Sequence, residues 1–170
     1  MIWLRAHARL AVFAVLVAAQ AAVVIAFVAR EEVYRRSGKE VVVHTIPVDP
    51  RDLLRGQYLT LGYRFQNLSN LAGGYVGPGD SVYVELRRRG RYWLAAGYRD
   101  SLGRRAEDTV YLRGRVASGF PPRAEFPDIS RYYVREGTPD PTEPPDVRLS
   151  VRGDGTARIV GLEIDGEPWP

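Results

Sequence analysis

The stretch SVYVELRRRGRYWLAAGY, residues 81–98, contains two apolar runs separated by a short arginine–glycine turn. Valine, tyrosine and tryptophan favour half-buried strands, and glycine favours the turn between them. The stretch therefore predicts a β-hairpin with antiparallel strands at 81–87 and 91–98.

A second hairpin is predicted near the end of the chain, where strands at 147–152 and 157–164 flank the sequence GDGT. The Asp-Gly pair supplies the positive φ angles that a tight hairpin turn requires. Further strands are expected at 40–46 and 109–117, and helical periodicity is scarce in this part of the chain. We therefore expect residues 40–170 to form a single antiparallel, mostly β domain.

The N-terminal part of the chain has a different character. Residues 10–29 read LAVFAVLVAAQAAVVIAFVA, with Gln20 as the one polar side chain and no charge. As a helix with a rise of about 1.5 Å per residue, they would span roughly 30 Å, the thickness of a bilayer's hydrocarbon core. Residues 1–9 would then be a tail and residues 30–39 a charged stalk. This predicts a single-pass membrane protein whose first partner is the lipid bilayer.

The alternative for this segment is a cleaved signal peptide. An Ala-Gln-Ala site exists at residues 19–21, but cleavage there would leave a further apolar run on the mature chain. An uncleaved anchor is therefore the favoured prediction. Its orientation does not follow from charge, because Arg5 and Arg9 precede the apolar stretch and the basic residues of 30–39 follow it.

Composition excludes several classes of function. The chain has no cysteine, which excludes disulfides, thiol catalysis and cysteine-based zinc sites. Its net charge of +4 includes Arg5 and Arg9, so the remaining chain is nearly neutral. Nucleic-acid binding normally needs a clustered basic face, and no nucleic-acid partner is expected.

The segment between the stalk and the first hairpin carries a motif, RGQYLTLGY at residues 55–63. Together with TIPVDPRDLLRG (45–56), ISRYYVREG (129–137) and VRLSVRGDGTARIVGLEIDG (147–166), it resembles the bacterial GDYXXLXY family, which is named for its motif. The resemblance spans nearly the whole chain. It implies an N-terminal membrane helix and a β-rich domain that lies outside the cytoplasm.

One motif position departs from the family pattern. Gly56, Tyr58, Leu61 and Tyr63 match, whereas Gln57 stands where the family has aspartate. Glutamine cannot act as a base or carry charge, so any carboxylate chemistry at this position would be lost. Glycine can adopt the positive φ of a turn, which favours a structural role for the start of the motif.

The rest of the motif has the period of a strand. Leu59, Leu61 and Tyr63 alternate with Tyr58 and Thr60, which predicts that the first three side chains face the core. A turn followed by a half-buried strand explains this spacing without any chemistry.

Charged residues beside the motif form the candidate site. Asp49, Arg51, Asp52 and Arg55 would make either surface ion pairs or a polar binding rim. His44 stands alone in a predicted strand, without a second histidine for a metal site. No catalytic residue, metal ion or cofactor is therefore predicted.

Arginines gather at the tip of the first hairpin, at residues 87–89 and 91. The simplest interpretation is a solvated turn. The alternative is contact with anionic lipid headgroups, worth about 1 kcal/mol per residue close to a membrane surface.

These features predict a membrane-anchored, non-catalytic binding or scaffolding module of the bacterial cell envelope. Its partner would be another membrane or envelope protein, and Gln20 with its neighbouring alanines could form a helix-packing face. The alternative is a degenerate hydrolase or ligand-binding domain built around Thr45, Asp49, Asp52 and Tyr58, with a strand pattern distantly similar to signal peptidases. A serine–lysine mechanism is not expected, since Lys39 is the only lysine and arginine does not lose its proton.

Overall fold

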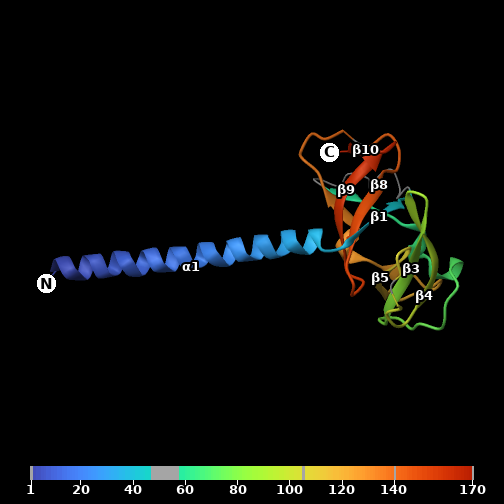
Figure 1. Cartoon of the computed structure of the whole chain (residues 1–170), viewed down its shortest axis with the longest axis horizontal. Helices are drawn as coiled ribbons and strands as arrows, with labels where there is room; N and C mark the ends of the chain where they lie inside the picture. Colours follow the sequence, from blue (N-terminus) through green and yellow to red (C-terminus); the bar gives the residue numbers. More distant parts are fainter. Residues whose placement is uncertain (1, 47–57, 105, 140, 170) are drawn as a thin grey trace. The chain divides into compact units, whose positions relative to one another are not determined.

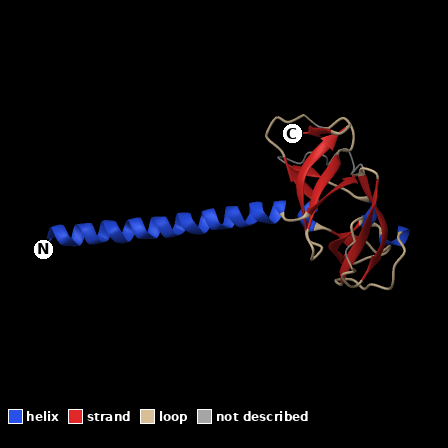
Figure 2. Cartoon of the chain, in the orientation of Figure 1, coloured by secondary structure: helices blue, strands red, loops and turns tan. Residues whose placement is uncertain are grey.

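The computed structural model describes residues 2–46, 58–104, 106–139 and 141–169. The chain forms two compact units, Met1–Ser37 and Gly38–Pro170. Figure 1 labels several elements of both units, and Figure 2 shows that the first is helical and the second consists mainly of strands and loops with short helical turns.

The first unit is one long helix, α1 (Ile2–Arg36). Its segment Phe13–Val33 is long and apolar enough to cross a membrane. Large apolar side chains such as Val23 and Phe27 are about 70% exposed, and they are where a lipid-facing helix would place them. The predicted span at 10–29 lies inside this helix.

The predicted stalk at 30–39 is divided between two elements. Helix α1 continues through Arg36, and strand β1 begins at Lys39. The helix ends at Arg36, before Ser37 and Gly38, and a Cβ atom at Gly38 would lie 2.2 Å from the Ser150 hydroxyl oxygen. Only glycine permits this close approach, so residue 38 fixes the point where the chain joins the sheet.

The second unit contains a curled sheet with the strand order β10-β9-β8-β1-β4-β3-β5-β6. Its strands are β1 (Lys39–His44), β3 (Ser81–Arg89), β4 (Tyr92–Arg99), β5 (Thr109–Val116), β6 (Ala124–Glu125), β8 (Asp146–Val151), β9 (Ala157–Ile164) and β10 (Glu167–Trp169). Both predicted hairpins, β3–β4 and β8–β9, are antiparallel as expected. The prediction of a mostly β, antiparallel domain is confirmed.

One pairing in this sheet is parallel. Strands β1 and β4 run in the same direction, and among the described residues their register consists of the single pair Val42–Tyr92. On its other edge β1 pairs with β8 along its whole length, from Lys39 opposite Val151 to His44 opposite Asp146. The sheet is therefore continuous on one side of β1 and opens on the other.

The far ends of the sheet curl toward each other. The amide of Arg113 in β5 donates a hydrogen bond of 2.8 Å to the carbonyl oxygen of Gly155, in the turn between β8 and β9. Gly155 has φ +86°, and a Cβ atom there would lie 3.1 Å from the Cβ of Arg113. This contact encloses the core between the two halves of the curled sheet.

The core follows the two-residue period of the strands. Val82, Val84 and Leu86 in β3 are fully buried, as are Val110 and Leu112 in β5. Alternate residues of a strand face opposite sides of a sheet, so these side chains all point inward.

A second, two-stranded sheet consists of β2 (Tyr58–Thr60) and β7 (Arg131–Tyr133). Short 3-10 helices accompany it: η2 (Arg64–Gln66), η3 (Leu68–Asn70) and η4 (Pro127–Ile129). These helices and the short strands β6, β7 and β10 were not predicted, because two or three residues are too few to show a period.

Candidate functional site

The core-facing side chains of the motif are buried as the sequence predicts, although strand β2 itself ends at Thr60 and does not continue to Tyr63. Leu59, Leu61 and Tyr63 are 0%, 3% and 1% exposed, whereas Tyr58 and Thr60 on the opposite face are half-buried. Gly56 and Gln57, the first motif positions, lie outside the described residues.

Tyr63 has a structural role in the core. Its hydroxyl donates a hydrogen bond of 2.6 Å to the carbonyl oxygen of Ile129 in η4, and its ring stacks on Phe65 at a centroid distance of 4.9 Å. Burial raises the pKa of the Tyr63 phenol far above its ordinary value. The phenol is therefore a neutral donor that ties the motif to η4.

Tyr58 lies in a different environment. It pairs with Tyr133 across β2 and β7, and the two ring centroids are 5.9 Å apart. The guanidinium of Arg131 lies 5.2 Å from the Tyr58 ring centroid. These neighbours account for Tyr58 as a packing residue of the small sheet.

The predicted polar rim of Asp49, Arg51, Asp52 and Arg55 falls within residues 47–57, outside the described residues. Of the residues proposed for hydrolase-like chemistry, Thr45 and Tyr58 are described, and the Thr45 hydroxyl donates a hydrogen bond of 2.6 Å to the carbonyl oxygen of Pro145. A hydroxyl engaged in this way is occupied as a donor.

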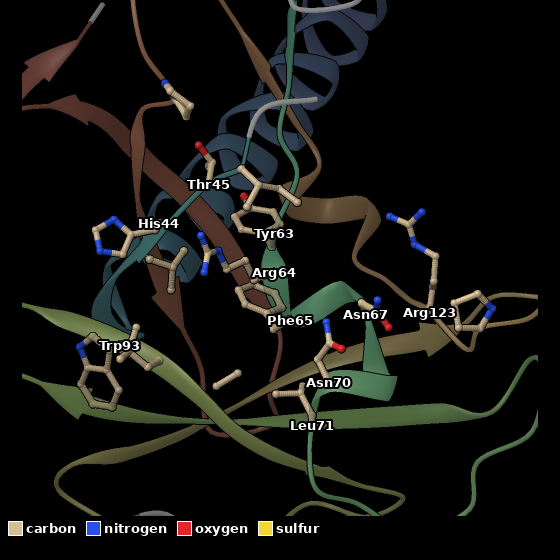
Figure 3. Close-up of a pocket in the computed structure, with 16 residues that line it drawn as sticks. His44, Thr45, Tyr63, Arg64, Phe65, Asn67, Asn70, Leu71, Trp93 and Arg123 are labelled. Carbon is tan, nitrogen blue, oxygen red and sulfur yellow. The ribbon is translucent and has the colours of Figure 1, made fainter. Parts of the chain in front are cut away.

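A cleft of about 1200 Å³ lies on the core side of the point where β1 and β4 separate (Figure 3). Beyond the Val42–Tyr92 pair, the amide of Ile46 turns away to donate a hydrogen bond of 3.0 Å to the carbonyl oxygen of Gly62. Further along β4, the amide of Tyr98 donates to the carbonyl oxygen of Ala72 at 2.9 Å. The cleft thus lies between these two attachments, beside residues 93–95 of β4.

The cleft has an apolar floor and a polar rim. The floor includes the buried side chains of Val43, Tyr63, Phe65 and Trp93, which line the cavity from three elements. The polar side chains on the rim belong to His44, Thr45, Arg64, Asn67, Asn70 and Arg123. An apolar cavity with a few polar groups around it is the usual form of a ligand site.

The segment that closes one side of the cleft is held by its own hydrogen bonds. The Asn67 side chain accepts a hydrogen bond of 3.1 Å from the amide of Ser69 at the start of η3. The amide of Leu68 donates to the carbonyl oxygen of Pro122 at 3.1 Å, next to the bridge between Asn67 and Arg123. These bonds fix the rim that carries Asn67 and Arg123.

At the opposite side, three residues form a polar cluster. His44 Nδ1 lies 2.7 Å from the carboxylate of Asp146, and its ring centroid lies 3.9 Å from that of Tyr92. A carboxylate only accepts, so Nδ1 carries the proton. A hydrogen bond to Asp146 and the charge of this carboxylate raise the pKa of Tyr92.

Sequence reasoning did not find this cluster. His44 and Asp146 are 102 residues apart and meet because β1 pairs with β8. A strand pairing of this range leaves no local signal in a single sequence, so only the fold brings the three residues together.

The arginines of the hairpin tip are exposed, and two of them also form ion pairs. Arg87 donates to the buried carboxylate of Glu85 at 2.7 Å, and Arg91 pairs with the buried carboxylate of Glu163. Arg88 donates to the carbonyl oxygen of Gly90. The side chains of Arg87 and Arg91 are nevertheless exposed, so the tip is solvated as predicted, and each of the two arginines also neutralises a carboxylate that burial would otherwise penalise.

Histidine, aspartate and glutamate side chains do not cluster in threes or more within the part of the chain that the structure describes. The described residues thus offer no evident cation site.

The comparisons with known proteins identify one family. The family model described as "GDYXXLXY protein" matches residues 20–162, which is most of the chain. The chain therefore belongs to the GDYXXLXY family. No curated protein and no solved structure matches it.

Proposed function

We propose that this chain is a membrane-anchored, non-catalytic binding module of the bacterial cell envelope. The observation that carries the proposal is the cleft between β1 and β4, with its aromatic floor and its rim of amide and guanidinium groups. Such a surface can bind a partner by burying apolar area and satisfying a few directed hydrogen bonds.

Anchoring is supported by α1. The segment Phe13–Val33 has the length and composition of a membrane span, and its described side chains are exposed as lipid contact requires. In this proposal the partner is a membrane or envelope protein that reaches the cleft from the same membrane.

The domain is proposed to lie outside the cytoplasm, as the family resemblance implies. The chain has no cysteine, so one introduced thiol would report sidedness cleanly. Ser101→Cys replaces an exposed residue and should react with a membrane-impermeant maleimide in intact spheroplasts. Reaction only after permeabilisation would place the domain in the cytoplasm instead.

The binding function is tested by photo-crosslinking in native membranes. A benzoylphenylalanine residue at Leu94, which lines the cleft and is 48% exposed, should yield a discrete adduct with one envelope protein. Leu102 is a matched control, because it is 44% exposed and does not line the cleft. Identical adducts from both positions, or none from Leu94, would contradict the proposal.

One observation favours the alternative of a degenerate hydrolase. Asp146 orients His44 through Nδ1, which leaves Nε2 directed elsewhere, as in an Asp–His pair that serves a nucleophile. Hydrolysis of a panel of nitrophenyl esters that disappears in His44→Gln would support this alternative. Equal background rates for both proteins would favour the binding module.

A further inference from the structure

We infer that the cleft binds an extended peptide segment of a partner protein, which adds as a strand beside β4 and carries acidic side chains at both ends of an apolar stretch. This inference rests on the proposed binding function and names the chemistry of its partner.

The first step concerns the edge of β4. This strand pairs with β3 along its length, but on its other side its register with β1 is the single pair Val42–Tyr92 in the described residues. The next main-chain contact on β4 is at Tyr98, whose amide bonds Ala72. The backbone of residues 93–95 therefore borders the cleft, where a peptide strand could form main-chain hydrogen bonds.

The second step concerns size and surface. At about 1200 Å³, the cleft is larger than the roughly 300–1,000 Å³ of most small-molecule sites. Trp93 and Ala95 of β4 line it, with Phe65 and Leu71 opposite. An added strand would direct every second side chain onto these apolar groups and the others toward the rim.

The third step is charge. Arg64 and Arg123 are both exposed and line the cleft, and neither guanidinium has an ion-pair partner among the described residues. The described lining includes no aspartate or glutamate. The rim therefore attracts acidic side chains, and attraction of this kind selects partners and speeds their association.

The placement of these arginines suits an extended ligand. Figure 3 draws Arg64 and Arg123 on opposite sides of Phe65 and Asn67. Acidic residues at the two ends of a bound strand could each face one of these guanidinium groups.

The test uses the full chain in nanodiscs of zwitterionic lipid and a fluorescent peptide about six residues long, the usual length of a strand. The probe has apolar residues at alternate positions and an aspartate at each end. Fluorescence anisotropy should show saturable binding. A peptide with lysine at both ends should bind at least about tenfold more weakly, because its charges face Arg64 and Arg123.

Two sets of variants locate the site. Arg64→Glu/Arg123→Glu should weaken binding of the acidic peptide at least about tenfold and improve binding of the lysine peptide. Arg89→Glu/Arg135→Glu changes the net charge equally at exposed positions outside the cleft, and should leave both affinities within about twofold. Leu94→Asp, at a half-exposed cleft position, should also weaken binding of the acidic peptide.

The inference is wrong if both double variants affect binding equally, or if methylating the peptide's main-chain nitrogens has no effect. Failure of the peptide assay can be separated from failure of the binding function. A discrete photo-adduct at Leu94 without peptide binding would leave a binding module whose partner is not an acidic strand. If neither the photo-adduct at Leu94 nor peptide binding is observed, the proposed binding function and the proposed acidic ligand are both wrong.

Discussion

The hydroxyl of Tyr63 and the carbonyl oxygen of Ile129 are hydrogen-bonded at 2.6 Å, and both residues are about 1% exposed. The bond joins the end of the family motif to η4, 66 residues further along the chain. A buried carbonyl group without a hydrogen-bond donor destabilises the folded state, because its lost hydration is not replaced by a hydrogen bond within the protein. The last tyrosine of the motif is therefore a link within the core.

Tyr63→Phe should lower the free energy of unfolding by about 1–3 kcal/mol, because the Ile129 carbonyl oxygen would be left buried without its donor. Urea unfolding of the full chain in detergent micelles measures this change. Tyr75→Phe is the control, since Tyr75 is 94% exposed and should change the stability by less than about 0.5 kcal/mol. Equal effects from both substitutions would contradict the role assigned to Tyr63.

Gly155→Ala should destabilise the domain more than Gly79→Ala. Both glycines have φ near +87°, so each substitution forces alanine into a conformation that costs about 1–3 kcal/mol. Only at Gly155 would the new Cβ also press against Arg113, whereas nothing lies within 4 Å at Gly79. The difference between the losses of unfolding free energy in the two variants measures the contact between Gly155 and Arg113 that closes the sheet. Equal losses would argue against a stabilising role for this contact.

Asp146→Asn should lower the pKa of Tyr92 toward its ordinary value. The hydrogen bond to Asp146 and its negative charge favour the protonated phenol, and asparagine removes the charge. Because the pKa of Tyr92 is raised in the folded state, the interaction with Asp146 stabilises the wild type at lower pH, and this stabilisation is lost as pH rises through the Tyr92 pKa. The variant should therefore lose less stability than the wild type over the same rise in pH. Tyrosine ring-carbon NMR follows the titration, with Asp128→Asn as a control at a carboxylate that pairs with Arg158 instead.

Val23→Arg/Val24→Arg should release the chain from membranes. Each arginine near the centre of the Phe13–Val33 segment costs about 2.5–3.5 kcal/mol of insertion free energy. Carbonate extraction should move this variant to the supernatant while the wild type stays in the pellet. Val33→Arg lies at the end of the segment, where a long side chain can reach the interface, and should remain membrane-bound.

Much of the fold could be predicted because short stretches of sequence mark its strands and turns. The predicted strands at 81–87, 91–98, 109–117, 147–152 and 157–164 each coincide with an observed strand to within about two residues. Alternating apolar residues or an Asp-Gly turn marks each of them. The order of these strands in the sheet, and the parallel pair of β1 with β4, carry no such local mark.

The candidate site could be predicted only in part. The burial of Leu59, Leu61 and Tyr63 follows from their alternation, and this prediction is confirmed. The cleft does not follow from any single stretch, because β1, β4 and the segment after Tyr63 each contribute one wall. The cluster of His44 with Asp146 likewise depends on a pairing across most of the domain.

The sequence by itself determined an apolar helix long enough for a bilayer, a domain of alternating strands and a motif whose apolar residues face inward. Periodicity and hydropathy act over a few neighbouring residues, so they can be seen without the fold. Only the tertiary structure decided that β1 and β4 separate after one pair and leave a cleft beneath Arg64 and Arg123. Contacts between distant strands arise from packing of the whole chain, and a local pattern cannot specify which edges meet and which remain open.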